Sequence, residues 1–167
     1  MAIPRTRAIG LCARGGRDVC RFVELLAVVT SVEIALRCGS LLTTRFAIDA
    51  ESLQVTFDPA RVAYTDLLQF FYRMHDPTTK DRQGMDSGTQ YRSAVFYHSA
   101  EQKAEAVKVT EAAQKQWFKN GKITTEILEA GRWWDAEDYH QLYLHHNPGG
   151  YECPAHFLRG FEPLKME

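Results

Sequence analysis

Two cysteines lie close together near the start of the chain, in the stretch "IGLCARGGRDVC" at residues 9–20. Cysteine attacks electrophiles as its thiolate, and a nearby positive charge lowers the pKa of the thiol. Either Cys12 or Cys20 is therefore a candidate nucleophile, and Arg14 lies close to Cys12. The alternative interpretation is that the arginines make this stretch a basic leader with no catalytic role.

A second candidate region is the polar segment "DPTTKDRQGMDSGTQYR" at residues 76–92, which has no apolar period. Long connections without regular structure are uncommon inside a compact domain and are often functional. Gly84 and Gly88 stand on either side of Asp86, and glycine permits backbone turns that other residues resist. Asp86 is therefore either a functional carboxylate or a cap for backbone amides in a surface loop.

The segments that flank this loop have the periodicity of strands and helices. We expect strands at 51–57, 93–98 and 123–128. A helix follows each strand: the first ends near His75 because Pro77 follows, and the second runs from a Ser99 cap to about Lys119. The third helix is expected at 136–146, capped by Asp135. Alternating strands and helices predict an α/β (α+β) fold with helices packed on one sheet.

The composition changes near residue 46. Every one of the seven tyrosines and three tryptophans lies at Tyr64 or beyond. We therefore divide the single domain expected of 167 residues into a divergent, poorly ordered segment at 1–46 and a folded part at 47–167.

Charge and cysteine content limit the classes of partner. A formal net charge of −1 gives no general attraction to nucleic acids or anionic membranes. The longest apolar stretch, residues 22–42, contains Glu24, Glu33 and Arg37, so we expect no transmembrane helix. Four cysteines without a C-x-x-C pair favour reduced thiols in the cytoplasm, and the arginine-rich start leaves a mitochondrial location as the alternative.

Several longer motifs point to one family. The stretches "DAESLQVTFDP", "FFYRMHDPTTKDRQGMDSGTQYRSAVFYH", "KITTEILEAGRWWDAEDYHQLYLHHNPGGYECP" and "HFLR" resemble the peptide methionine sulfoxide reductase A family, over residues 49–161, with a tail most similar to its fungal members. The resemblance implies a two-layer, ferredoxin-like α/β plait. It also implies reduction of methionine S-sulfoxide, free or in proteins, with thioredoxin as reductant, no cofactor or metal, and a monomeric chain.

The same resemblance assigns roles to individual residues. Glu51 matches the glutamate that protonates the sulfoxide oxygen, and Asp86 and Tyr91 match the residues that hold that oxygen. Cys12 aligns with the nucleophile. Cys153 falls on the resolving cysteine of the tail, which condenses with the sulfenic acid left after attack. Outside these motifs, Glu51 would be interpreted as a solvated strand end and Tyr91 as a packing aromatic.

The match fails around the nucleophile. The family's Gly-Cys-Phe-Trp-Gly motif corresponds here to "GLCARGG", so Ala13 and Arg14 replace the aromatic pair that contacts the substrate methyl group. The family's tyrosine before the glutamate has no counterpart in residues 16–48, and Cys20 and Cys38 are rival nucleophiles in poorer contexts. A shifted reading frame upstream of residue 49 and a divergent paralogue both explain this difference.

Two other interpretations follow from these features. A chain without the aromatic pair could bind methionine-containing peptides, or sense redox state, without reducing sulfoxides. His140, His145 and His146 suggest a metal site, but positions 140 and 145 lack the i, i+4 spacing of a shared helical face.

Overall fold

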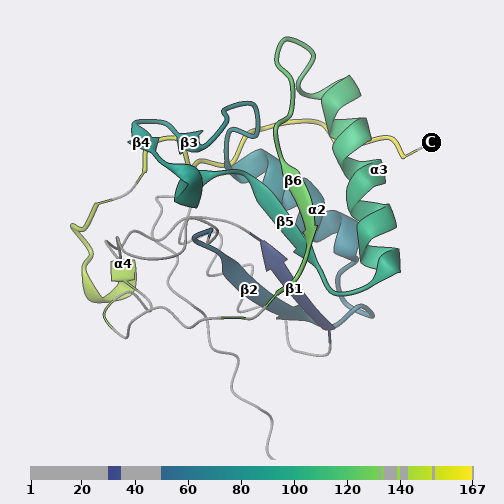
Figure 1. The fold of residues 1–167 in the computed structure, drawn as a ribbon, viewed down its shortest axis with the longest axis horizontal. Coiled ribbons are helices and arrows are strands. Elements are labelled where there is room, and N and C mark those ends of the chain that lie inside the picture. Colours follow the sequence, from purple (N-terminus) through teal and green to yellow (C-terminus); the bar gives the residue numbers. More distant parts are fainter. Residues whose placement is uncertain are drawn as a thin grey trace, which may run out of the picture.

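The structure is a computed structural model, and it describes residues 30–34, 50–131, 133, 139, 143–151 and 153–166. Every structural statement below concerns these residues. Figure 1 shows helices α2 and α3 beside the larger sheet and a short hairpin at the edge of the molecule.

The sheet has four strands in the order β2-β1-β5-β6. They are β1 (Thr30–Ile34), β2 (Leu53–Phe57), β5 (Ala94–Tyr97) and β6 (Glu126–Glu129). β1 pairs antiparallel with both of its neighbours, whereas β5 and β6 run parallel. The sheet is therefore mixed, which the order of strands and helices alone left undecided.

Two helices form the second layer, α2 (Tyr64–Met74) and α3 (Ala100–Gln116). They pack against each other, and α3 also contacts β5 and β6 (Figure 1). The buried core between the layers contains Leu53, Val55, Phe57, Leu67, Leu68, Phe71, Tyr72, Val95, Val109 and Ala113. The predicted two-layer α/β architecture is confirmed.

Local sequence explains where these elements begin. Leu53, Val55 and Phe57 are buried on one side of β2, as their alternation predicts. The hydroxyl of Ser99 accepts a hydrogen bond from the Gln102 amide at 3.2 Å and so caps α3. β6 begins three positions later than predicted, because the amide and hydroxyl of Thr124 donate to Pro77 O instead of joining the strand ladder.

The polar segment after α2 contains a small hairpin that the sequence did not predict. It is formed by β3 (Arg82–Gln83) and β4 (Asp86–Ser87), followed by the 3-10 helix η1 (Thr89–Tyr91). Only Gly84 and Met85 connect the strands, and Gly84 has φ +58°, as the first position of a type II′ turn requires.

The sequence analysis assigned no element to residues 1–46, yet β1 lies within them and occupies an interior position in the sheet. The helix expected at 136–146 has one described α-helical part, α4 (Tyr143–His146), and its expected cap Asp135 lies outside the described residues. No helix in the described ranges has the length and apolar character to cross a membrane.

The C-terminal segment is anchored to both helices. The amide of Arg159 donates to Arg73 O at 2.9 Å, and the Arg73 Nε donates back to Arg159 O at 2.8 Å. Further on, Leu164 N donates to the Gln69 side chain, and Trp117 Nε1 donates to Glu162 O. The residues from Arg159 onward are therefore fixed to the body of the domain.

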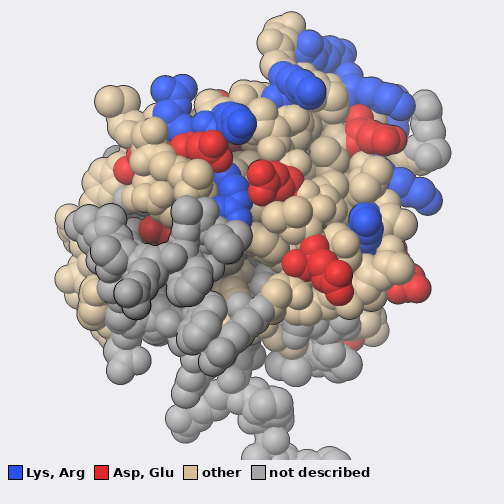
Figure 2. Space-filling view, viewed as in Figure 1, with Lys and Arg blue, Asp and Glu red and all other residues tan. Residues whose placement is uncertain are grey.

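Acidic and basic side chains are interspersed on the described part of the face in Figure 2. This distribution agrees with the small net charge and gives no support for a polyanion-binding surface on that face.

Candidate functional site

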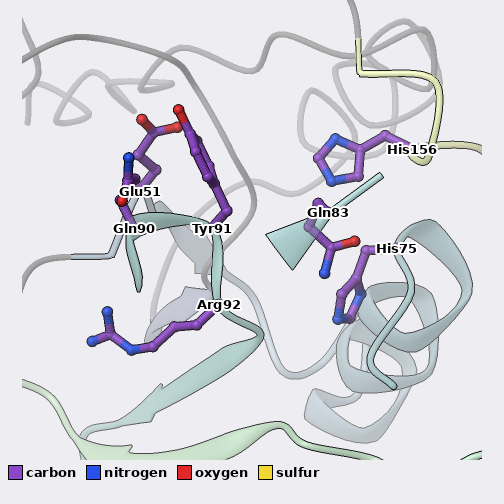
Figure 3. Close-up of a pocket in the computed structure, with 7 residues that line it drawn as sticks. All are labelled: Glu51, His75, Gln83, Gln90, Tyr91, Arg92 and His156. Atoms are coloured by element: carbon purple, nitrogen blue, oxygen red, sulfur yellow. The ribbon is translucent and has the colours of Figure 1, made fainter. Parts of the chain in front are cut away.

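Glu51 and Tyr91 lie side by side although forty positions separate them in the sequence. Glu51 lies two positions before the first residue of β2, and its amide donates to Gln90 O at 3.1 Å, which joins this end of the strand to η1. Tyr91 is the last residue of η1. Figure 3 shows the carboxyl group and the phenol hydroxyl next to each other and pointing in the same direction. The Oε2 atom of Glu51 is buried.

The conformation of the η1 segment depends on Gly88. Its φ of 145° is a value that side chains disfavour, and a Cβ there would collide with the side chain of Gln90. The amide of Gly88 donates to Asp81 O, and Tyr91 N donates to Gly88 O, both at 2.9 Å. This glycine therefore directs the chain so that Tyr91 faces Glu51.

Arg92 supports the same segment from the opposite side. Its Nη1 donates to Thr89 O at 2.9 Å, and its Nε donates to Glu126 Oε2 at 3.1 Å. In Figure 3 its guanidinium points away from the carboxyl group of Glu51. Arg92 thus links η1 to β6.

A small cavity of about 10 Å³ lies beside this pair (Figure 3). Its lining consists of Glu51, His75, Gln83, Gln90, Tyr91, Arg92 and His156. These residues come from the segment before β2, from the end of α2, from β3, from η1 and the residue after it, and from the tail, so five separate segments converge here.

His75 is buried under the cavity and is held at both ring nitrogens. Because the Phe71 carbonyl can only accept, Nδ1 carries a proton and donates to it at 2.7 Å, while Nε2 accepts from Ser93 Oγ at 2.7 Å. Ser93 in turn accepts from Thr125 Oγ1 at 2.7 Å. Burial lowers the pKa of His75 to about 3, so the ring is neutral at physiological pH.

Gln83 connects the hairpin to the end of α2. Its Oε1 accepts from Asp76 N at 3.1 Å, and its Nε2 donates to Asp76 O at 2.8 Å. The side chain is 4% exposed. This bidentate contact fixes the hairpin relative to His75 and completes the floor of the cavity.

Asp86 does not line the cavity. It lies on β4 and accepts from the Tyr151 hydroxyl, with 3.1 Å to Oδ2 and 3.4 Å to Oδ1. The described contact of this carboxylate is therefore with the tail, while Glu51 and Tyr91 face the cavity.

Cys153 is buried beneath the hairpin, with 0% exposure. Its thiol donates to Gln83 O at 3.6 Å, and a Cβ at Gly84 would lie 3.7 Å from its sulfur. His156 N donates to Cys153 O at 3.0 Å. The tail therefore packs closely against the hairpin, and its thiol has no access to solvent in this arrangement.

The proposed nucleophile Cys12 lies outside the described residues, as do Cys20 and Cys38. Of the other four predicted residues, the structure brings Glu51 and Tyr91 together and places Asp86 and Cys153 on the neighbouring hairpin–tail contact. The sequence analysis did not identify the remaining lining residues, His75, Gln83, Gln90, Arg92 and His156. All five lie in the quoted motifs, His156 in "HFLR" and the other four in "FFYRMHDPTTKDRQGMDSGTQYRSAVFYH", which was the available signal.

A buried carboxyl group next to a phenol is suited to proton transfer. A carboxyl group that carries a proton can donate it to a developing oxyanion, and a phenol hydroxyl can hold that oxygen. Within the described ranges, no three His, Cys, Asp or Glu side chains are arranged to hold a metal ion.

Comparison with protein families gives one match along most of the chain. The model described as "Peptide methionine sulfoxide reductase" matches residues 42–165. A probable peptide methionine sulfoxide reductase of Schizosaccharomyces pombe is 54% identical over 110 residues, which are 66% of this chain and 65% of that protein. The chain thus spans just under two thirds of this curated relative.

Solved structures also share the fold. Reduced Mxr1 from Saccharomyces cerevisiae superimposes with a TM-score of 0.70 at 37% identity, covering 91% of this chain and 89% of that one. Mxr1 in complex with Trx2 superimposes with a TM-score of 0.51 at 28% identity, covering 89% and 86%.

Proposed function

The chain belongs to the peptide methionine sulfoxide reductase family, and from this premise we propose that it reduces methionine S-sulfoxide, free or in proteins, to methionine. The observation that carries the proposal is the carboxyl group of Glu51, whose Oε2 atom is buried, beside the Tyr91 hydroxyl at the cavity. This pair supplies an acid and an oxygen-binding group, the two functions that removal of a sulfoxide oxygen requires.

The proposed reaction begins at sulfur. The thiolate of Cys12 attacks the sulfoxide sulfur while Glu51 donates a proton to the oxygen, and Tyr91 stabilises that oxygen by hydrogen bonding. The S–O bond of the substrate breaks, so that the sulfoxide becomes a thioether. The oxygen remains on Cys12, which is left as a sulfenic acid. Methionine has then gained the two electrons that the cysteine has lost.

The enzyme is restored by thiols. Cys153 condenses with the sulfenic acid, which forms a disulfide and releases water, and an external dithiol then reduces that disulfide. Trx2 is bound to Mxr1 in a related structure, which supports a thioredoxin as the external reductant here. In this proposal the electrons come from thiols, so the protein needs no bound cofactor. We also propose that it acts as a monomer in the reducing cytoplasm.

Asp86 has an indirect role in this scheme. Because its carboxylate accepts from Tyr151, it holds the tail that contains Cys153, in addition to the oxygen-positioning role implied by the family. Both roles lie in the same hairpin, so substrate binding and movement of the tail are coupled through β4.

The test is turnover of the separate S and R epimers of methionine sulfoxide by the full chain with dithiothreitol. We expect reduction of the S epimer only. Glu51→Gln should lower turnover by about 10²- to 10⁴-fold without loss of folding, whereas Glu129→Gln, which removes an exposed carboxyl group on β6, should leave it unchanged. Separate serine substitutions at Cys12, Cys20 and Cys38 identify the nucleophile.

A second candidate function is binding of methionine-containing peptides without reduction. It is favoured by the loss of the Phe-Trp pair at Ala13 and Arg14. Folded protein that binds a methionine sulfoxide peptide but does not consume it under dithiothreitol would support this function and refute the reductase.

A further inference from the structure

The tip of the β3–β4 hairpin presents a methionine to solvent. Met85 is the second residue of the two-residue turn, and its side chain is 88% exposed. Figure 1 shows the hairpin at the edge of the molecule, away from the helical layer.

Exposure controls the oxidation of a thioether, since a peroxide needs only to approach the sulfur. The chain has four methionines, and three of them are described. Met74 is 2% exposed in the core, Met166 is 44% exposed near the C-terminus, and Met85 is twice as exposed as Met166. Met85 is therefore the described methionine most open to oxidation.

The hairpin cannot place Met85 in its own cavity. Gln83, two positions earlier, lines the cavity floor and is tied to Asp76 by two hydrogen bonds, while Met85 extends from the turn into solvent. The inner side of Gly84 is packed against the tail, with Ala155 Cβ 3.2 Å from where a Cβ would be. A cavity that accepts Met85 must therefore belong to a second molecule of the protein.

The narrow β3–β4 turn allows Met85 to enter the cavity of a second molecule. A two-residue turn is the narrowest projection that a hairpin can make, and Gly84 adds no side chain beside the thioether. The projecting side chain is thus accessible along its whole length to a concave partner.

We propose that Met85 is an oxidation site whose S-sulfoxide is a substrate for a second copy of this chain, an inference that rests on the proposed function. A peroxide transfers one oxygen to the sulfur of Met85 and leaves as water or an alcohol. Two thiols of the second copy then remove that oxygen as water and become a disulfide, which dithiothreitol or a thioredoxin reduces. The protein thereby repairs damage to its own site-forming hairpin.

The test uses Glu51→Gln protein as substrate, because its own activity is impaired in the proposed reaction. It is treated with one equivalent of hydrogen peroxide, and the sulfoxide at each methionine is quantified by peptide mass spectrometry. We expect Met85 to be oxidised at least about tenfold faster than Met74. Catalytic unoxidised wild-type protein and dithiothreitol should then remove roughly half of the Met85 sulfoxide, the S epimer.

Two controls separate the possible results. Met85→Leu should retain turnover of free methionine S-sulfoxide. Its mass spectra should lack the sulfoxide signal of the peptide that contains position 85. The rate of repair per molecule in oxidised wild-type protein should rise with protein concentration, as a reaction between two copies requires.

If wild-type protein reduces free methionine sulfoxide but leaves the Met85 sulfoxide intact, this inference fails and the proposed function stands. Reduction of neither substrate overturns both. A repair rate independent of concentration, or slower oxidation of Met85 than of Met74, also overturns the inference.

Discussion

At the residue scale, the placement of Glu51 and Tyr91 at one cavity concentrates the proposed chemistry in two side chains from different segments. The amide of Glu51 donates to Gln90 O, so a backbone hydrogen bond rather than the side chains themselves sets their relative position. Substitution of either side chain should consequently alter reactivity with little effect on the fold.

Tyr91→Phe keeps the ring and removes the hydroxyl that would bind the sulfoxide oxygen. We expect kcat to fall by about ten- to a hundredfold, with the free energy of unfolding nearly unchanged. Steady-state kinetics and urea unfolding check this prediction. Tyr97→Phe, on β5 and outside the cavity lining, is the matched control and should leave kcat unaltered.

The lowered pKa of His75 predicts how the stability of the domain changes as the pH falls. Its pKa is about 3 in the folded chain, against about 6.5 in an unfolded one, so the unfolded state binds the proton first as the pH falls. This contribution to stability is present above pH 6.5 and is lost at up to about 1.4 kcal/mol per pH unit as the pH falls from there toward 3.

Urea unfolding of wild-type protein and of the His75→Gln variant, at several pH values between 7 and 4, checks this prediction. The variant should start less stable, because its contacts to Phe71 and Ser93 are altered, but it should lose stability more slowly on acidification. Equal slopes for the two proteins would refute the role given to His75.

At the element scale, sequence patterns predicted the elements that have a period or a cap. β2, α2, β5 and α3 follow alternation, helical spacing and the Ser99 cap. The hairpin β3–β4 was missed because strands of two residues have no period. β1 was missed because it lies in a long apolar run, residues 22–42, that contains no turn residue near its start.

The cap of α3 is testable by Ser99→Ala. Loss of the bond to the Gln102 amide should lower the free energy of unfolding by about 1 kcal/mol. Thermal or urea unfolding measures the change. Ser87→Ala, at an exposed position on β4, should cost far less, and a similar loss from both variants would show that the cap is not the cause.

Contact between the tail and the hairpin predicts the reactivity of Cys153. Tyr151→Phe removes the hydrogen bond to Asp86 and should raise the rate of alkylation of Cys153 about fivefold, the effect of roughly 1 kcal/mol. Peptide-resolved mass spectrometry distinguishes Cys153 from the other three cysteines. Tyr139→Phe, at a position 64% exposed, is the control, and an unchanged rate in Tyr151→Phe would mean that this bond does not hold the tail.

At the scale of the whole molecule, the sheet order makes the start of the chain essential. β1 lies between β2 and β5, with Val32 opposite Val55 and Ile34 opposite Val95. Sequence patterns could not supply this order, because it depends on pairing between distant segments. The same is true of the cavity, whose lining comes from five parts of the chain.

A chain that begins at residue 49 should therefore fail to fold, although it keeps nearly all of the motifs that define the family. β2 would lose its neighbour on the side of β1, and β5 would keep only β6. Circular dichroism and size-exclusion chromatography of this truncation, beside the full chain, test the prediction. A monomeric, cooperatively unfolding truncation would contradict it.

The anchor at Arg159 also sets how far the tail thiol can travel. Cys153 precedes Arg159 by six positions, and an extended chain of that length spans at most about 20 Å. A thiol tethered within such a radius samples a small volume, which corresponds to an effective concentration in the millimolar range. Recycling of the enzyme would then be a fast intramolecular step, and its rate would depend on the length of chain between residues 153 and 159 rather than on the concentration of any partner.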